Sequence, residues 1–304
     1  NGGGLTLWSD ATLTISDGGT VTSNEAAIGN ERFDSMVESI VVVTDEGSSL
    51  AVDGELNLGN GRGAGVLLIA SGANVSSGDA NVGNSNNNSD TQSAGTATIT
   101  GSGSRWDSDG EIVISSGRHT EGTLTVSNGG VVSANDRVVV GTNGELLGDG
   151  TIEADVLNRA TIAPVGTPGG RLAITGDFVQ EDIGTLQIGA AGTTPGITYD
   201  QLAVGGEVDL DGAVEFSLEA GFMPAVGDQF DVITGATSVS GQFSNAILPG
   251  LPKGMIWLEE NQATGFSLRV GTAFTADFDV DGDVAGDDLA QWQGDFGLNG
   301  KSDS

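Results

Sequence analysis

Short apolar segments alternate with polar, glycine-rich corners along most of the chain, and residues 123–150 show the pattern in full. This stretch reads TLTVSNGGVVSANDRVVVGTNGELLGDG, in which two apolar segments, 124–126 and 138–140, are separated by a polar glycine corner. A third apolar pair, Val131 and Val132, lies between them. Short apolar segments bounded by turn residues are typical of β-strands, so the stretch predicts one coil of a repeating β-structure.

The same unit recurs upstream at a nearly constant interval. One apolar position directly precedes a small polar or glycine corner, and its occurrences are 28, 26, 30 and 27 residues apart: Ile15, Val43, Ile69, Ile99 and Val126. A second apolar anchor follows the first by 13, 15, 13, 15 and 14 residues: Ile28, Leu58, Val82, Ile114 and Val140. Strands this short bury their apolar faces only by stacking on neighbouring units. We therefore predict a parallel β-helix, or β-solenoid, in which the members of each set line up.

The pattern divides the chain into three regions. Residues 1–170 carry the solenoid repeats, and the polar inserts at 30–38 and 84–95 are expected to form loops. Residues 171–270 are expected to form a β-rich cap or to continue the solenoid. The strands predicted there are 171–174, 185–188, 201–204, 207–210, 214–218, 229–234, 255–258 and 265–270. Residues 271–304 are predicted to form a calcium-binding loop followed by a short helix, which leaves the fold class all-β.

Composition narrows the classes of function. The 304 residues carry a formal net charge of −32, from Asp+Glu 42 and Lys+Arg 10. A charge of this sign repels nucleic acid and anionic membranes, and no apolar run is long enough to span a bilayer, so we expect neither nucleic-acid binding nor membrane insertion. Gly 51 against Pro 6 fits glycines at the corners of apolar segments rather than collagen or proline-rich disorder. The absence of cysteine leaves the redox compartment open.

One motif near the C-terminal end carries specific chemistry. Residues 277–288, DFDVDGDVAGDD, match the spacing of a calcium loop, which needs oxygen ligands at positions 1, 3, 5, 7, 9 and 12 and glycine at position 6. The predicted ligands are Asp277, Asp279, Asp281, Asp283 through its backbone carbonyl, and Asp288. Ala285 stands at position 9 and leaves that place to water. Ca²⁺ is therefore the expected cofactor, and the alternative is an acidic tail that binds no metal.

The features that favour catalysis are weaker. His119 is the single histidine and adjoins Arg118. A polysaccharide lyase needs such a base and a cationic group, but an ordinary surface turn is the favoured explanation for one pair. Acid pairs such as Glu181-Asp182 and Glu259-Glu260 would suggest a glycoside hydrolase, which uses two carboxylates across a cleft, yet chance neighbours are expected among 42 acids.

The tryptophans offer a second route to sugar binding. Trp8, Trp106 and Trp257 would form a stacking platform for a sugar if they shared one face. Each also fits an edge or core position of the solenoid. Core or edge positions are favoured over the platform.

Three stretches resemble a known group of repeat proteins. The runs TLTVSNGGVVSA, GELLGDGTIEADVLNRATIAPVGTPGGRLAITGDFVQ and GTLQIGAAGTTPGITYDQLAVGGEVDLDGAVEFSL resemble the passenger β-helices of bacterial autotransporters and related repeat proteins exported by planctomycetes. The resemblance covers most of residues 5–270 and implies a β-helix at the cell surface or outside the cell. The loop at 277–288 resembles one half of a type I dockerin, which implies calcium binding and a cohesin-like partner.

These observations together favour an extracellular structural or adhesive β-solenoid that is not an enzyme. We expect its partner to be a second copy of the chain, in a homo-oligomer, a calcium-stabilised fibre or a surface layer. One alternative is a dockerin-type anchoring or binding module with a cohesin-like partner. The least favoured alternative is a polysaccharide-active enzyme with a polysaccharide partner.

Overall fold

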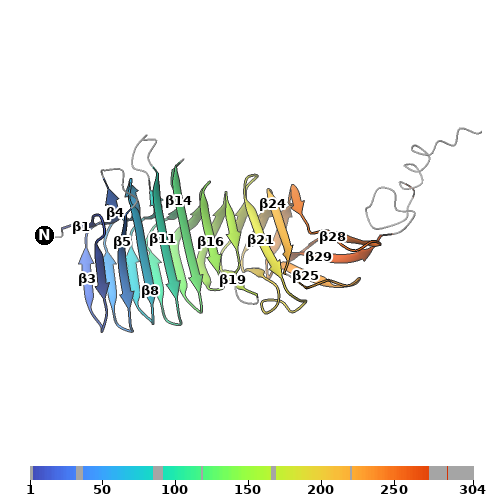
Figure 1. The fold of residues 1–304 in the computed structure, drawn as a ribbon, viewed down its shortest axis with the longest axis horizontal. Coiled ribbons are helices and arrows are strands. Elements are labelled where there is room, and N and C mark those ends of the chain that lie inside the picture. The colour runs from blue at the N-terminus through green and yellow to red at the C-terminus, as the bar shows by residue number, and fades with distance from the viewer. Residues whose placement is uncertain are drawn as a thin grey trace, which may run out of the picture.

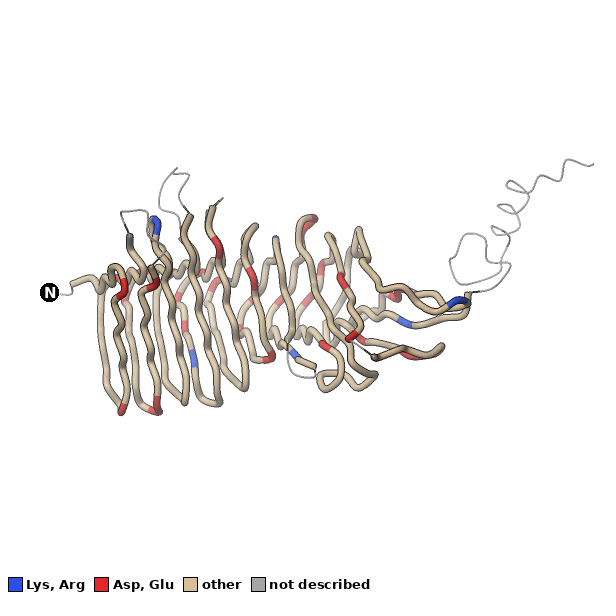
Figure 2. The backbone as a smooth tube through the Cα atoms, viewed as in Figure 1, with Lys and Arg blue, Asp and Glu red and all other residues tan. Residues whose placement is uncertain are grey.

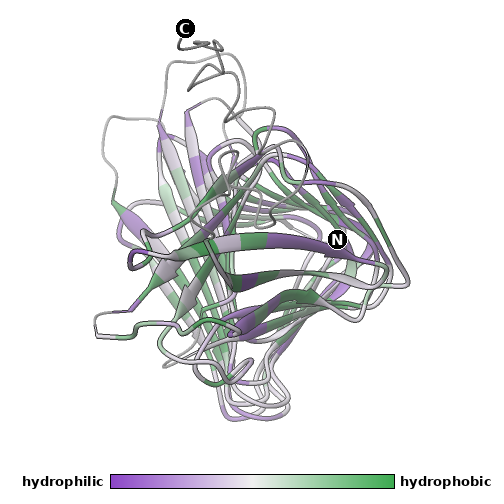
Figure 3. Ribbon diagram, turned by 90° about the vertical axis from the view of Figure 1, so that its right-hand side faces the viewer, coloured by the Kyte–Doolittle hydropathy of each residue, from purple (hydrophilic) through white to green (hydrophobic). Residues whose placement is uncertain are grey.

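The computed structural model describes residues 3–31, 37–84, 92–117, 119–165, 169–219, 221–273 and 286. The first six segments form an elongated stack of coils (Figure 1), each of which adds strands to parallel sheets that run the length of the molecule. Viewed along the stack, three walls enclose a common interior (Figure 3). The prediction of an all-β parallel solenoid is confirmed for these residues. Most of each predicted insert, 32–36 and 85–91, lies outside them, as do nearly all residues beyond 273.

The first wall is a ten-stranded parallel sheet. Its strands are β2 (Thr12–Ile15), β5 (Glu38–Thr44), β8 (Ala64–Ala70), β11 (Ser93–Thr100), β14 (Thr120–Ser127), β16 (Gly144–Gly148), β18 (Thr161–Ala163), β21 (Thr185–Ala190), β24 (Ala213–Leu218) and β27 (Asn245–Ile247). Each strand pairs in parallel with the next strand in this series, so this wall gains one strand per coil.

The second and third walls belong to a 19-stranded sheet, because two long strands, β15 (Val131–Val140) and β17 (Thr151–Asn158), bend through both. The second wall otherwise contains β3 (Thr20–Ser23), β6 (Ser49–Val52), β9 (Asn74–Ser77), β12 (Arg105–Ser108), β19 (Arg171–Ile174), β22 (Gln201–Val204) and β25 (Gln229–Thr234). The third contains β1 (Leu5–Leu7), β4 (Ala26–Glu31), β7 (Leu56–Gly61), β10 (Ala80–Asn84), β13 (Ile112–Ile114), β20 (Phe178–Gln180), β23 (Glu207–Leu210) and β26 (Ser238–Gly241).

Strand register confirms both predicted columns. In the first wall, each member of the first set is the direct partner of the next: Ile15, Val43, Ile69, Ile99 and Val126. In the third wall, the second set pairs in the same way: Ile28, Leu58, Val82, Ile114 and Val140. All ten side chains belong to the buried core. The dry interior is therefore continuous across these coils, because every coil places an apolar side chain directly on the one below it.

The corner between the first and second walls is a tight turn. Asn128 and Gly129 have φ angles of 53° and 81°, and the Gly130 nitrogen donates a hydrogen bond to the Ser127 oxygen at 2.9 Å. Positive φ at both central residues defines a type I′ turn, which Asn-Gly sequences favour. The same pair of positive φ angles occurs at Asp17-Gly18 and Ser71-Gly72.

A column of glycines lies where the first wall approaches the third. Four residues in neighbouring strands are direct partners: Gly65, Gly95, Gly122 and Gly144. A Cβ atom at Gly95 would lie 2.1 Å from the Gly83 nitrogen and 2.6 Å from the Val82 carbonyl carbon. Only glycine fits there without a backbone shift. Ser39 holds the equivalent place in β5, where its fully buried Oγ has no hydrogen-bond partner.

The last coils replace aliphatic packing with aromatic packing. Phe230 lies at the centre, with its ring 5.3 Å from that of Tyr199, 5.0 Å from that of Phe216 and 5.9 Å from that of Trp257. Tilted and edge-on contacts at these distances are favourable beyond their buried area. The aromatic group fills the interior where the solenoid meets the C-terminal hairpin.

Parallel pairing continues through the region after residue 170. It ends at β26 and β27, and the chain then forms an antiparallel hairpin from β28 (Met255–Gln262) and β29 (Gly265–Thr272). Strand β29 also pairs antiparallel to β25. The strands predicted here coincide with β19, β21, β22, β23, β24, β25, β28 and β29, whereas β20, β26 and β27 were not predicted.

Candidate functional site

The predicted calcium ligands Asp277, Asp279, Asp281, Asp283 and Asp288 lie outside the described residues. Calcium binding by this loop therefore stays a prediction. Within the part of the chain that the structure describes, no three His, Asp or Glu side chains are grouped so that they could hold a metal ion.

A cleft of about 580 Å³ lies at the edge of the first wall. It is lined by Gln92, Ser93, His119, Thr120, Glu121, Thr123, Asn143 and Glu145. The cleft forms where strand length drops, since β14 has eight residues and β16 has five. The longer strands β11 and β14 project past β16 at this edge (Figure 1). His119 is exposed at its rim, while its neighbour Arg118 lies outside the described residues.

The chemistry of this cleft is polar and acidic. Glu121 and Glu145 are both exposed, and Thr123 on β14 is the direct partner of Glu145 on β16. A second, smaller hollow of about 280 Å³ shares Asn143 and Glu145 with the first. Sequence reasoning identified His119 but missed the carboxylates beside it, because their proximity follows from strand register. Hydroxyl, amide and carboxylate groups of this kind can bind a polar ligand.

Among the described residues, the carboxylate with the largest pKa shift belongs to Asp200, which sequence reasoning did not single out. Its Oδ1 accepts a hydrogen bond from the Gly170 nitrogen at 2.7 Å, and its Oδ2 accepts one from the Gly189 nitrogen at 2.8 Å. Burial raises the pKa of Asp200 to about 6, against the opposing effect of these two backbone donors. Through these two bonds, Asp200 holds residues 191–200 against the start of β19 and the end of β21. Its contacts therefore support a structural role.

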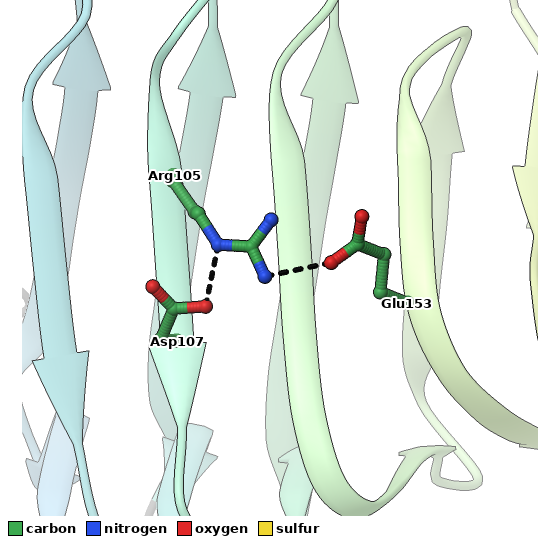
Figure 4. Close-up of polar contacts among 3 residues, drawn as sticks. All are labelled: Arg105, Asp107 and Glu153. Carbon is green, nitrogen blue, oxygen red and sulfur yellow. Dashed lines mark hydrogen bonds and ion pairs between the residues drawn. The ribbon is translucent and has the colours of Figure 1, made fainter.

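One member of each predicted acid pair forms an ion pair with an arginine. Glu181 forms two bonds to Arg159, at 2.9 and 3.0 Å, and this contact lowers the pKa of Glu181. Glu260 binds Arg269 at 2.7 Å. A third arginine, Arg105 on β12, binds both Asp107 and Glu153 at 2.6 Å (Figure 4). Glu153 lies on β17, with β15 between the two strands, so this arginine ties three successive coils together.

Trp8, Trp106 and Trp257 do not share one surface. Trp106 is completely buried, and its Nε1 donates a hydrogen bond to Ser77 Oγ at 3.1 Å. Trp257 packs against the aromatic core and donates to the Pro249 oxygen at 2.9 Å. Trp8 is 42% exposed. These positions support core and edge roles, and the burial of Trp106 excludes a platform made of all three.

Comparison with known proteins assigns no family to the chain. No protein-family model matches the sequence, and no curated protein matches it. Among the described residues, no helix is long and apolar enough to cross a membrane.

Proposed function

We propose that this chain is a structural or adhesive protein of the cell exterior that associates with copies of itself into fibres or layers. The observation that carries the proposal is the uninterrupted stacking of coils. Val43, Ile69 and Ile99 are completely buried in one column, and parallel strand pairing joins their coils. A body built this way supplies stiffness, reach and long continuous faces. The resemblance of its repeats to autotransporter passenger β-helices supports the location outside the cell.

Electron microscopy and analytical ultracentrifugation of the purified chain test self-association. We expect ordered assemblies whose size increases with protein concentration and with millimolar calcium. The same samples with a chelator serve as the matched condition. Monodisperse monomers in both conditions, at every concentration reached, would refute the proposal.

Calcium binding at residues 277–288 is the second part of the proposal. It is supported by the ligand spacing and by the mutual repulsion of aspartates such as Asp277, Asp279 and Asp281, which a divalent cation relieves. Isothermal titration of calcium into the full chain should show binding that the double variant Asp277→Ala/Asp281→Ala abolishes. Asp53→Ala, which removes one exposed aspartate of the solenoid, should leave binding unchanged. Equal binding by all three proteins would place the ion elsewhere.

A dockerin-type anchor is the second candidate function, because Asp288 closes the loop as aspartate does in type I dockerins. Its partner would be a cohesin-like module. Pull-down of the chain on immobilised cohesin modules, with calcium and then with a chelator, separates anchoring from self-association. Calcium-dependent capture by cohesin, with no self-association, favours the anchor.

A further inference from the structure

In the N-terminal half of the first wall, the middle of each strand presents no charged side chain outward, on a chain whose net charge is −32. Ten outward-facing residues on five consecutive strands form two rows, which we call the neutral face. The first row is Thr12, Ile40, Val66, Thr96 and Thr123, and the second is Thr14, Val42, Leu68, Thr98 and Thr125. All ten are exposed or half-buried, in alternation with core residues.

Carboxylates surround this face without entering it. Glu38 and Glu121 lie at the starts of β5 and β14, and Asp45 and Glu46 lie at the corner that follows β5. The first row ends at Glu145, the direct partner of Thr123. Figure 2 shows this wall mostly tan, with red at the bends along its lower edge. The centre is methyl-rich, since β5 and β8 place Ile40, Val42, Val66 and Leu68 there.

We infer that the neutral face is where a second copy of this chain packs, an inference that rests on the proposed self-association. Two strongly acidic molecules repel each other, and the repulsion is weakest where neither presents a charge. Consider a two-fold axis that runs parallel to the strands, between β5 and β8. It places β5 of one copy opposite β8 of the other, so their aliphatic side chains meet, and it places the threonines of β2 opposite those of β11. These four strands are thus complementary to themselves, as a two-fold interface requires, and the threonines of β14 lie at the margin of the contact. Flat sheets packed in this way lie about 10 Å apart.

The size of the face sets the strength of the contact. Strands about 4.8 Å apart, and rows about 6.6 Å apart along them, give a face of at most about 400 Å² per copy when its margins are included. Two copies would bury about 800 Å², below the roughly 1,200 Å² of stable complexes. One such contact is weak and, being two-fold, joins only two copies, so growth into fibres or layers requires a second contact elsewhere on the chain. The surrounding carboxylates add a repulsion that salt screens, so association should strengthen as ionic strength rises.

Sedimentation equilibrium of the full chain at low and high sodium chloride tests this face. Leu68→Glu adds a carboxylate at its centre, and we expect the association constant to fall at least about tenfold. Ser76→Glu makes the same charge change at an exposed position of β9 in the second wall and should alter the constant by no more than about twofold. The double variant Val66→Thr/Leu68→Thr keeps strand-forming residues and removes the aliphatic centre. It should weaken association as well, so the test remains decisive if Leu68→Glu does not fold.

The outcomes separate this inference from the proposed function. Association that Leu68→Glu and Ser76→Glu weaken equally removes the neutral face as the contact and leaves self-association standing. Monomers under every salt and calcium condition overturn both. Retention of the wild-type chain on a polysaccharide, lost in Leu68→Glu and unaccompanied by self-association, overturns the inference in favour of a glycan surface.

Discussion

Substitution of Gly95 by alanine should destabilise the solenoid severely. The new Cβ would lie 2.1 Å from the Gly83 nitrogen, whereas ordinary contacts begin at 3.4 Å, so the backbones must separate by about 1.3 Å. Neither can move alone, because β11 pairs with β8 on one side and β14 on the other. Overpacking against side chains costs about 1–3 kcal/mol, and rigid backbone puts this case at or above the upper end, about 3–5 kcal/mol. The lower entropy of the unfolded alanine chain offsets only about 0.4–1 kcal/mol.

Urea unfolding followed by far-ultraviolet circular dichroism measures this cost. Thr96→Ala is the matched control, because it changes the adjacent residue of the same strand where the side chain points outward. The control should lose about 1 kcal/mol or less. If Gly95→Ala unfolded at the same urea concentration as Thr96→Ala, the glycine column would be a consequence of composition and not a steric requirement.

Four further changes test other contacts, each by urea unfolding. Ser39→Ala should raise the unfolding free energy by about 1 kcal/mol or more, because it removes a buried hydroxyl without a hydrogen-bond partner. A lower unfolding free energy in this variant would mean that the hydroxyl does form a hydrogen bond. Trp106→Phe should cost about 2 kcal/mol, since it leaves the buried Ser77 Oγ without its donor, and a neutral result would contradict that bond. Burial raises the pKa of Asp200, so the folded protein holds this proton more tightly than the unfolded chain. Stability should therefore fall as pH rises from 3.8 through about 6, less so in Asp200→Asn. Identical pH profiles would rule out that linkage. Arg105→Ala should cost less than about 1 kcal/mol, because both ion pairs are solvent-accessible, and a larger loss would show that the arginine does more than bridge coils.

The apolar columns could be predicted from the sequence because each coil repeats the same physical requirement. A residue such as Ile69 must be apolar wherever the coil below it presents Val43 and the coil above presents Ile99. The interval between coils varies, yet the position just before the corner does not, so pattern alone identified direct partners. The three apolar segments of residues 123–150 also fall on three different walls, one in β14 and two in β15.

Features that depend on contact between walls were not predictable in the same way. The glycine column is visible in the sequence only as scattered glycines, because its cause is the third-wall backbone behind it. Strand β26 contains a single apolar residue, Val239, and has no alternation that could mark it. The cleft near His119 likewise arises from the difference in length between β14 and β16.

The acidity of the chain and the stacking of its coils are linked at the corner between the second and third walls. Asp79 Oδ1 accepts a hydrogen bond from the Glu111 nitrogen at 3.0 Å. Farther along, Asp155 accepts from the Asp177 nitrogen at 2.8 Å, and Asp177 accepts from the Glu207 nitrogen at 2.7 Å. Each carboxylate thus satisfies a backbone donor of the next coil where the strand ladder is interrupted. Bonds to an ionised acceptor are stronger than neutral ones, so part of the charge that makes copies repel one another also holds each copy together.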